Sequence, residues 1–107
     1  MTPEVKERID DLLKQHKIFV FIKGSKLTPE CRYSKNVVQI LNTLEVSYDT
    51  LDVMQDYEIR EGIKDYSNWP TIPQIYIYGQ FVGGSDILSD LAQKGELQQM
   101  VEVALAS

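Results

Sequence analysis

The first half of the chain alternates between helical spacing and short apolar runs. Apolar residues recur at helical spacing over residues 3–17, where a proline suits the first turn of a helix. The unbroken run Ile18–Ile22 follows at once and is typical of a strand buried on both faces. Residues 31–44 predict a second helix, and residues 47–53 a second strand. A strand, a helix and a strand of these lengths indicate a parallel crossover unit.

The second half predicts an antiparallel hairpin between two helical segments. Residues 56–66 have helical spacing, and two strands over 73–78 and 80–83 lie so close in the chain that only a hairpin can join them, around Gly79-Gln80. A closing helical segment over 88–105 is interrupted near Gly95. We therefore expect an α/β fold in which helices flank a four-stranded mixed sheet.

Size and charge narrow the function classes. The chain has 107 residues, of which 43% are hydrophobic and 25% charged, so it fits a single domain over residues 1–107. Its net charge of −5 argues against a nucleic-acid partner, which normally reveals itself by basic excess. No stretch has transmembrane length, and the first residues resemble no signal or transit peptide. We expect a cytoplasmic protein without a membrane partner.

Cys31 is the single cysteine and a candidate nucleophile. It follows a turn-rich segment and leads a helix, where unpaired backbone N–H groups and the positive end of the helix dipole favour a thiolate. Arg32 adds a positive charge beside it. The alternative is a small hydrophobic residue packed inward, because free cysteine is often buried. With one cysteine, any redox chemistry needs a second thiol from another molecule.

Several motifs together resemble monothiol glutaredoxins of the single-domain Cys-Gly-Phe-Ser type. They are Lys23-Gly24, the seven-residue loop of residues 24–30, Cys31-Arg32-Tyr33-Ser34, Trp69-Pro70-Thr71-Ile72-Pro73-Gln74 and Gly83-Gly84-Ser85-Asp86. The resemblance covers nearly the whole chain and implies a thioredoxin-like (glutaredoxin) fold. This chain departs from the family in having Arg32 and Tyr33 where relatives have Gly and Phe.

The resemblance also implies a glutathione site. Its candidate binding residues are Lys23, Tyr33, Arg60, Thr71, Ile72, Pro73, Gly84, Ser85 and Asp86. Lys23 and Arg60 match the positions that hold the glycine carboxylate, and Ile72 would pair with the peptide through its main chain, beside a cis-proline. The Gly84–Asp86 stretch would hold the γ-glutamyl group at a helix start. Taken alone, each charged residue could equally be a solvated surface group.

Two mechanisms compete for Cys31. In the first, Cys31 is a metal ligand: two chains and two glutathiones supply four thiolates to a [2Fe-2S] cluster, which holds a homodimer and is passed to iron–sulfur acceptor proteins. In the second, Cys31 is the catalytic nucleophile of a glutathione-dependent oxidoreductase that acts on glutathionylated proteins and binds a cluster weakly or not at all. A non-enzymatic adaptor is the third reading. The bulk of Arg32 would disfavour a cluster at the dimer face, whereas its positive charge would favour an anionic cluster. The sequence therefore does not rank cluster binding against oxidoreductase activity.

Overall fold

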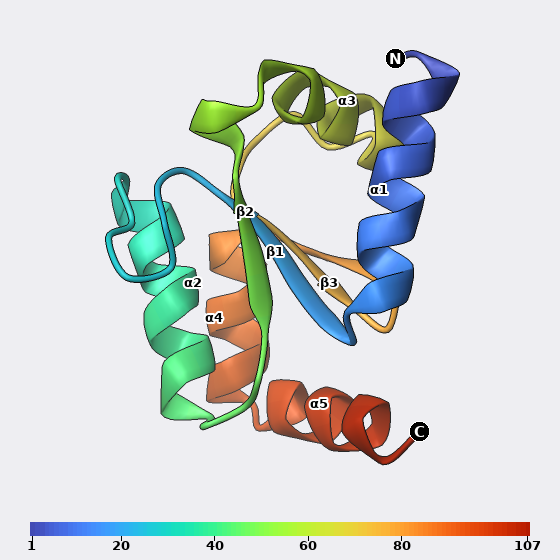
Figure 1. Cartoon of the computed structure of the whole chain (residues 1–107). Coiled ribbons are helices and arrows are strands. Elements are labelled where there is room, and N and C mark those ends of the chain that lie inside the picture. Colours follow the sequence, from blue (N-terminus) through green and yellow to red (C-terminus); the bar gives the residue numbers. More distant parts are fainter.

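The computed structural model describes residues 1–107, which form helices and strands in alternation (Figure 1). In chain order the elements are α1 (Pro3–Gln15), β1 (Ile18–Ile22), α2 (Arg32–Thr43), β2 (Asp49–Asp52), the 3₁₀ turn η1 (Val53–Gln55), α3 (Tyr57–Ser67), β3 (Gln74–Ile77), β4 (Gln80–Gly83), α4 (Ser85–Gln93) and α5 (Glu96–Ala106). No helix is both long enough and apolar enough to span a bilayer.

The four strands form one mixed sheet in the order β2-β1-β3-β4. β1 runs parallel to β2, with Val20 opposite Thr50, and antiparallel to β3, with Val20 opposite Ile75. β3 and β4 form the antiparallel hairpin. The predicted mixed sheet and its parallel crossover are confirmed.

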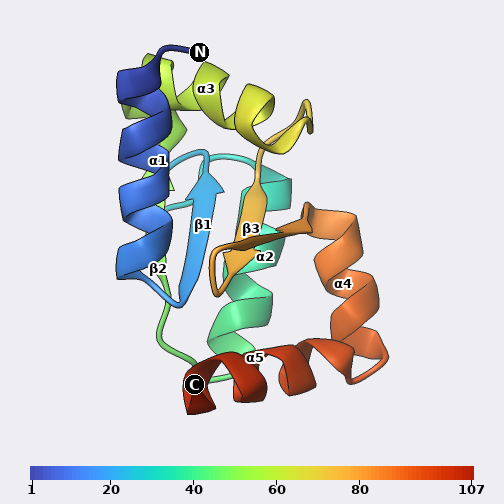
Figure 2. The ribbon, with the colours of Figure 1, turned by 90° about the vertical axis from the view of Figure 1, so that its right-hand side faces the viewer.

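Helices cover both faces of the sheet and create two apolar cores (Figures 1 and 2). The larger core joins α2, α4 and α5 to β1 and β3, and the smaller joins α1 and α3 to the opposite face of the same strands. All five residues of β1 are buried, because its side chains point alternately into the two cores. The strand β1 is therefore buried on both faces, as its unbroken apolar run predicts.

The structure differs from the sequence prediction at β2 and at the hairpin turn. The predicted strand over 47–53 is shorter, because the side chain of Asp52 accepts a hydrogen bond from the Met54 N–H and starts η1. The hairpin turn lies at Tyr78 and Gly79, not at Gly79-Gln80, and both of these residues have positive φ. The expected interruption of the closing segment near Gly95 is confirmed, because Gly95 has a φ of 75° and separates α4 from α5.

Helix α1 packs closely against α3. At Gly62 an added Cβ would lie 2.6 Å from Cγ1 of Val5, so the two helices meet where a glycine hydrogen leaves room. Met1 and Arg8 on the α1 side also form ion pairs with Asp65 and Asp56 at the two ends of α3. These contacts hold α3 in place, and α3 carries Arg60, which lines the pocket described below.

Candidate functional site

The thiol of Cys31 caps the N-terminus of α2. Cys31 has extended backbone geometry (φ −142°, ψ 154°) and its sulfur accepts a hydrogen bond from the Ser34 N–H at 3.3 Å. The side chain is partly exposed rather than packed in a core. The sequence predicted this residue at the start of a helix, and the structure places it just before the first turn.

The hydroxyl of Ser34 contacts the same sulfur. Ser34 is fully buried, and its Oγ lies 3.2 Å from the Cys31 sulfur. The neutral Cys31 thiol donates to this Oγ, and the backbone N–H of Lys23 also donates to it at 3.1 Å, so the hydroxyl proton can turn to the sulfur once Cys31 is ionised. Burial acts to raise the pKa of the Cys31 thiol, but the hydrogen bonds from Ser34 and the N–H of Tyr33, with the charge of Lys23, lower it on balance.

A pocket of about 470 Å³ opens beside the thiol, within the size range of small-ligand sites. Its wall contains all nine predicted binding residues, namely Lys23, Tyr33, Arg60, Thr71, Ile72, Pro73, Gly84, Ser85 and Asp86. Lys64, Trp69, Pro70 and Ile87 complete it. Cys31 is outside this wall, and Lys23 and Tyr33 connect it to the pocket.

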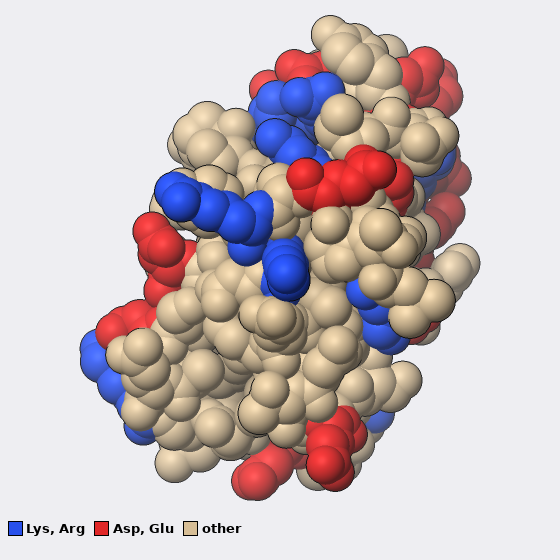
Figure 3. Space-filling view, turned by 90° about the vertical axis from the view of Figure 1, so that its left-hand side faces the viewer, with Lys and Arg blue, Asp and Glu red and all other residues tan.

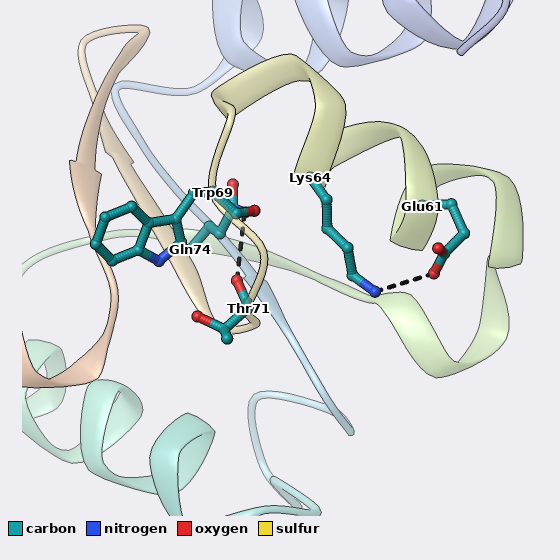
Figure 4. Close-up of polar contacts among 5 residues, drawn as sticks. All are labelled: Glu61, Lys64, Trp69, Thr71 and Gln74. Carbon is teal, nitrogen blue, oxygen red and sulfur yellow. Dashed lines mark hydrogen bonds and ion pairs between the residues drawn. The ribbon is translucent and has the colours of Figure 1, made fainter.

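One side of the pocket is basic. Lys23 follows β1, and Arg60 and Lys64 lie one turn apart on α3. Lys64 is engaged by Glu61 at 3.1 Å, as Figure 4 shows, whereas the Nε of Arg60 is buried without a hydrogen-bond partner. Basic side chains gather on the face that bears α2 and the loop before it (Figure 3). This charge is local, because the whole chain carries −5.

The loop between α3 and β3 lines the pocket, and a buried side chain at the start of β3 holds it through hydrogen bonds. The amide nitrogen of Gln74 donates to the carbonyls of Trp69 at 3.0 Å and Thr71 at 3.3 Å (Figure 4). Gln74 is fully buried, and its oxygen accepts from the Tyr76 hydroxyl at 3.0 Å. The Ile72–Pro73 bond in this loop is cis, as expected. Gln74 was not predicted as a supporting residue, although a glutamine inside an apolar strand was the available signal.

The opposite side of the pocket is the start of α4. Gly84 precedes the helix and makes no side-chain cap, and a Cβ there would meet the carbonyl of Pro73 at 3.4 Å. The same Cβ would lie 3.6 Å from the indole nitrogen of Trp69, which is buried without a partner. Ser85 is buried and Asp86 is exposed at the first turn. This side offers the backbone N–H groups of a helix terminus to an anion.

The two departing residues of the active-site motif interact with each other. The guanidinium of Arg32 lies 4.9 Å from the centre of the Tyr33 ring and donates to the Tyr33 hydroxyl at 2.9 Å. Both side chains are exposed, and Tyr33 lines the pocket. Arg32 therefore covers the outer face of Tyr33 and carries its charge at the entrance of the site.

Comparison with known proteins decides the family. The Glutaredoxin family model matches residues 18–82. A monothiol glutaredoxin of Synechocystis sp. is 64% identical over 107 residues, which is the full length of both chains. The chain belongs to the glutaredoxin family, in its monothiol group. The glutaredoxin also shares 46% identity over 107 residues with monothiol glutaredoxin-S7 of rice, a chloroplastic protein, of which it covers 64%.

Solved structures confirm the glutaredoxin fold. The solution structure of reduced apo GrxS14 from poplar superimposes with a TM-score of 0.87 at 42% identity, covering 99% of this chain and 97% of that one. A buckwheat glutaredoxin–glutathione complex shares the fold, with a TM-score of 0.83 at 22% identity, covering 97% of this chain and 96% of that one. Because the plant relatives in rice and Arabidopsis are chloroplastic, the expected cytoplasmic location stays a prediction.

Proposed function

We propose that this glutaredoxin binds glutathione in the pocket beside Cys31. One observation carries the proposal: a basic wall and a helix N-terminus face the same pocket, and a thiol with a lowered pKa adjoins it. Glutathione has a carboxylate at each end and a thiol between them. Lys23 and Arg60 suit the glycine carboxylate, because ammonium and guanidinium groups pair strongly with carboxylates.

The remaining contacts follow the shape of the pocket. The main chain of Ile72 in the loop between α3 and β3 would pair with the tripeptide, and Thr71, Pro73 and Tyr33 would flank it. At the start of α4, Gly84 and Ser85 would receive the γ-glutamyl carboxylate and Asp86 its ammonium group. Occupation of the pocket would supply acceptors for the buried nitrogens of Arg60 and Trp69, which lack them in the free protein.

The bound glutathione would make Cys31 one of four ligands to a [2Fe-2S] cluster in a homodimer. The donor set fits, because a partly exposed thiol with a lowered pKa is the soft ligand that such clusters use. Each chain contributes one thiolate and holds one glutathione, which contributes the second. A cluster held in this way could be released to an acceptor protein, since half of its ligands are exchangeable.

A second function, removal of glutathione from proteins, is favoured by the hydrogen bonds to Cys31. The Cys31 thiolate would attack the glutathione sulfur of a mixed disulfide, form a Cys31–glutathione disulfide and release the protein thiolate, which takes up a proton. A second glutathione thiolate would then attack, yielding oxidised glutathione and restoring the Cys31 thiolate. Ser34 stabilises the thiolate at both ends of this sequence.

Anaerobic reconstitution with iron, sulfide and glutathione tests the proposal. We expect visible absorbance of a [2Fe-2S] cluster and a dimer on gel filtration, both dependent on glutathione, and neither with Cys31→Ser. Turnover of a glutathionylated substrate without a cluster would favour the second function. A protein that binds no glutathione by calorimetry would refute both and favour an adaptor.

A further inference from the structure

Asn36 links helix α2 to the start of α4 at the edge of the pocket. Its amide nitrogen lies 2.8 Å from the hydroxyl oxygen of Ser85 and 2.9 Å from that of Ser89. An amide nitrogen carries two protons, so each hydroxyl receives one. The two helices pack against each other along this line, and Ser85, the first residue of α4, is buried at 7% exposure while still lining the pocket.

This arrangement fixes the direction of the hydrogen bond at Ser85. Because its oxygen accepts from Asn36, its own proton is left for a different acceptor, and it makes no hydrogen bond to any protein acceptor. The vacant first turn of α4 lies beside it, without a side-chain cap. An anion seated there would meet the hydroxyl proton of Ser85 together with the helix N–H groups.

We propose that Asn36 is a positioning residue that makes Ser85 a hydrogen-bond donor to the γ-glutamyl carboxylate of glutathione. The inference rests on the proposed function. Asn36 does not line the pocket and acts through Ser85. Ser34 is arranged similarly at the thiol, where the Lys23 N–H donates to its hydroxyl oxygen and its own proton is available to the Cys31 thiolate.

Asn36→Asp is the sharpest test, because it keeps the shape and reverses the polarity. A carboxylate at this position would accept the Ser85 proton and add negative charge beside the anion site. We expect the Kd for reduced glutathione, measured by calorimetry on the full chain, to rise on the order of tenfold, the usual loss for a hydrogen bond to a charged group. Gln39→Glu adds the same charge at an exposed position on α2 and should leave the Kd unchanged.

An altered ligand separates positioning from structural damage. The analogue γ-aminobutyryl-cysteinyl-glycine keeps the amine but lacks the carboxylate in question, so it should bind the wild-type protein and Asn36→Asp equally. The pKa of Cys31, read from the pH dependence of alkylation, should also stay the same, although Cys31 and Asn36 share α2. In a Ser85→Ala background, Asn36→Ala, which adds no charge, should cost little more.

Each other outcome overturns the inference. Unchanged glutathione affinity in Asn36→Asp would show that Ser85 needs no orientation, and equal weakening of the analogue would place the effect elsewhere. If Asn36→Asp does not fold, the cycle of Asn36→Ala with Ser85→Ala takes its place, and full additivity contradicts the proposal. Failure of the wild-type protein to bind glutathione would remove the proposed function as well, so the two failures are distinguishable.

Discussion

The two ends of the site use their hydrogen-bond donors in opposite ways. At the thiol end, donors are already engaged: the Lys23 N–H donates to the Ser34 Oγ, the Ser34 N–H donates to the Cys31 sulfur, and the Cys31 thiol donates to the Ser34 Oγ. At the pocket end, the Arg60 Nε and the Trp69 indole nitrogen are buried without partners. The thiol is therefore prepared before any ligand binds, whereas the pocket carries unpaired groups that a ligand can satisfy. Reactivity and affinity should be separable by mutation.

The largest expected effect is that of Cys31→Ser, which breaks the comparison at the thiol end alone. Cluster assembly and thiol exchange should both be lost, because the same sulfur is ligand and nucleophile. Glutathione affinity should change little, since Cys31 lies outside the pocket wall. Absorbance after reconstitution measures cluster assembly at the thiol end, and calorimetry measures glutathione affinity at the pocket end of the same variant. A retained cluster would contradict the assignment of Cys31.

Arg60→Ala should have the next largest effect, and only at the pocket end. Losing a charged hydrogen-bond partner costs roughly 1.5–3 kcal/mol, so glutathione binding should weaken about tenfold or more. The pH profile of Cys31 alkylation should not move. Lys64→Ala is the matched control on the same helix and should cost less, because Lys64 is already paired with Glu61. Equal losses in the two variants would argue against a specific role for Arg60.

Lys23→Ala should affect both ends, which sharpens the comparison at the residue where they meet. The Lys23 side chain lines the pocket and also lowers the pKa of Cys31. We expect weaker glutathione binding in calorimetry together with a higher Cys31 pKa in alkylation kinetics. A change in only one of the two measurements would show that the ends are more independent than the geometry indicates.

Ser34→Ala should change reactivity without changing affinity. The hydrogen bonds of Ser34 help to lower the pKa of Cys31, so the variant should have a higher pKa and a smaller thiolate fraction at neutral pH. Alkylation should slow at pH 7 and recover at higher pH, where the thiol ionises in both proteins. The Kd for glutathione is the control, and a large rise in it would connect Ser34 to the pocket.

Arg32→Gly should have the smallest effect and tests the entrance between the two ends. Removing the side chain stacked on Tyr33 takes bulk from the surface beside Cys31, so the cluster should decay more slowly. Deglutathionylation should become slower, because the charge of Arg32 no longer stabilises the leaving thiolate. Cluster decay and substrate turnover are the measurements. Faster decay in Arg32→Gly would mean that the charge of Arg32 matters more than its bulk.

The sequence predicted the elements of the fold better than their exact ends. The apolar run Ile18–Ile22 could only be a central strand, but the turn at Tyr78 requires a positive φ (53°) for an aromatic residue, which no local pattern indicates. The early end of β2 depends on a side-chain cap by Asp52. Such boundaries are set by individual hydrogen bonds rather than by periodicity.

The pocket residues came from motifs, and the residues that support them did not. The family resemblance named the nine wall residues because they lie in recognisable stretches of sequence. Ser34, Asn36 and Gln74 act through partners that come from other elements or lie several residues away. Pairings of this kind depend on how the helices pack against the sheet and on the path of a loop, so they were visible only in three dimensions.

The close approach of α1 to α3 has a consequence for the mutational tolerance of the chain. Gly62 lies on the side of α3 that faces α1, and any larger residue there meets Val5, so either the Val5 side chain or α3 must shift. Arg60 would move with α3. The face of α3 that contacts α1 is thus under a packing constraint, and a substitution at Gly62 can change the placement of Arg60 without touching the pocket.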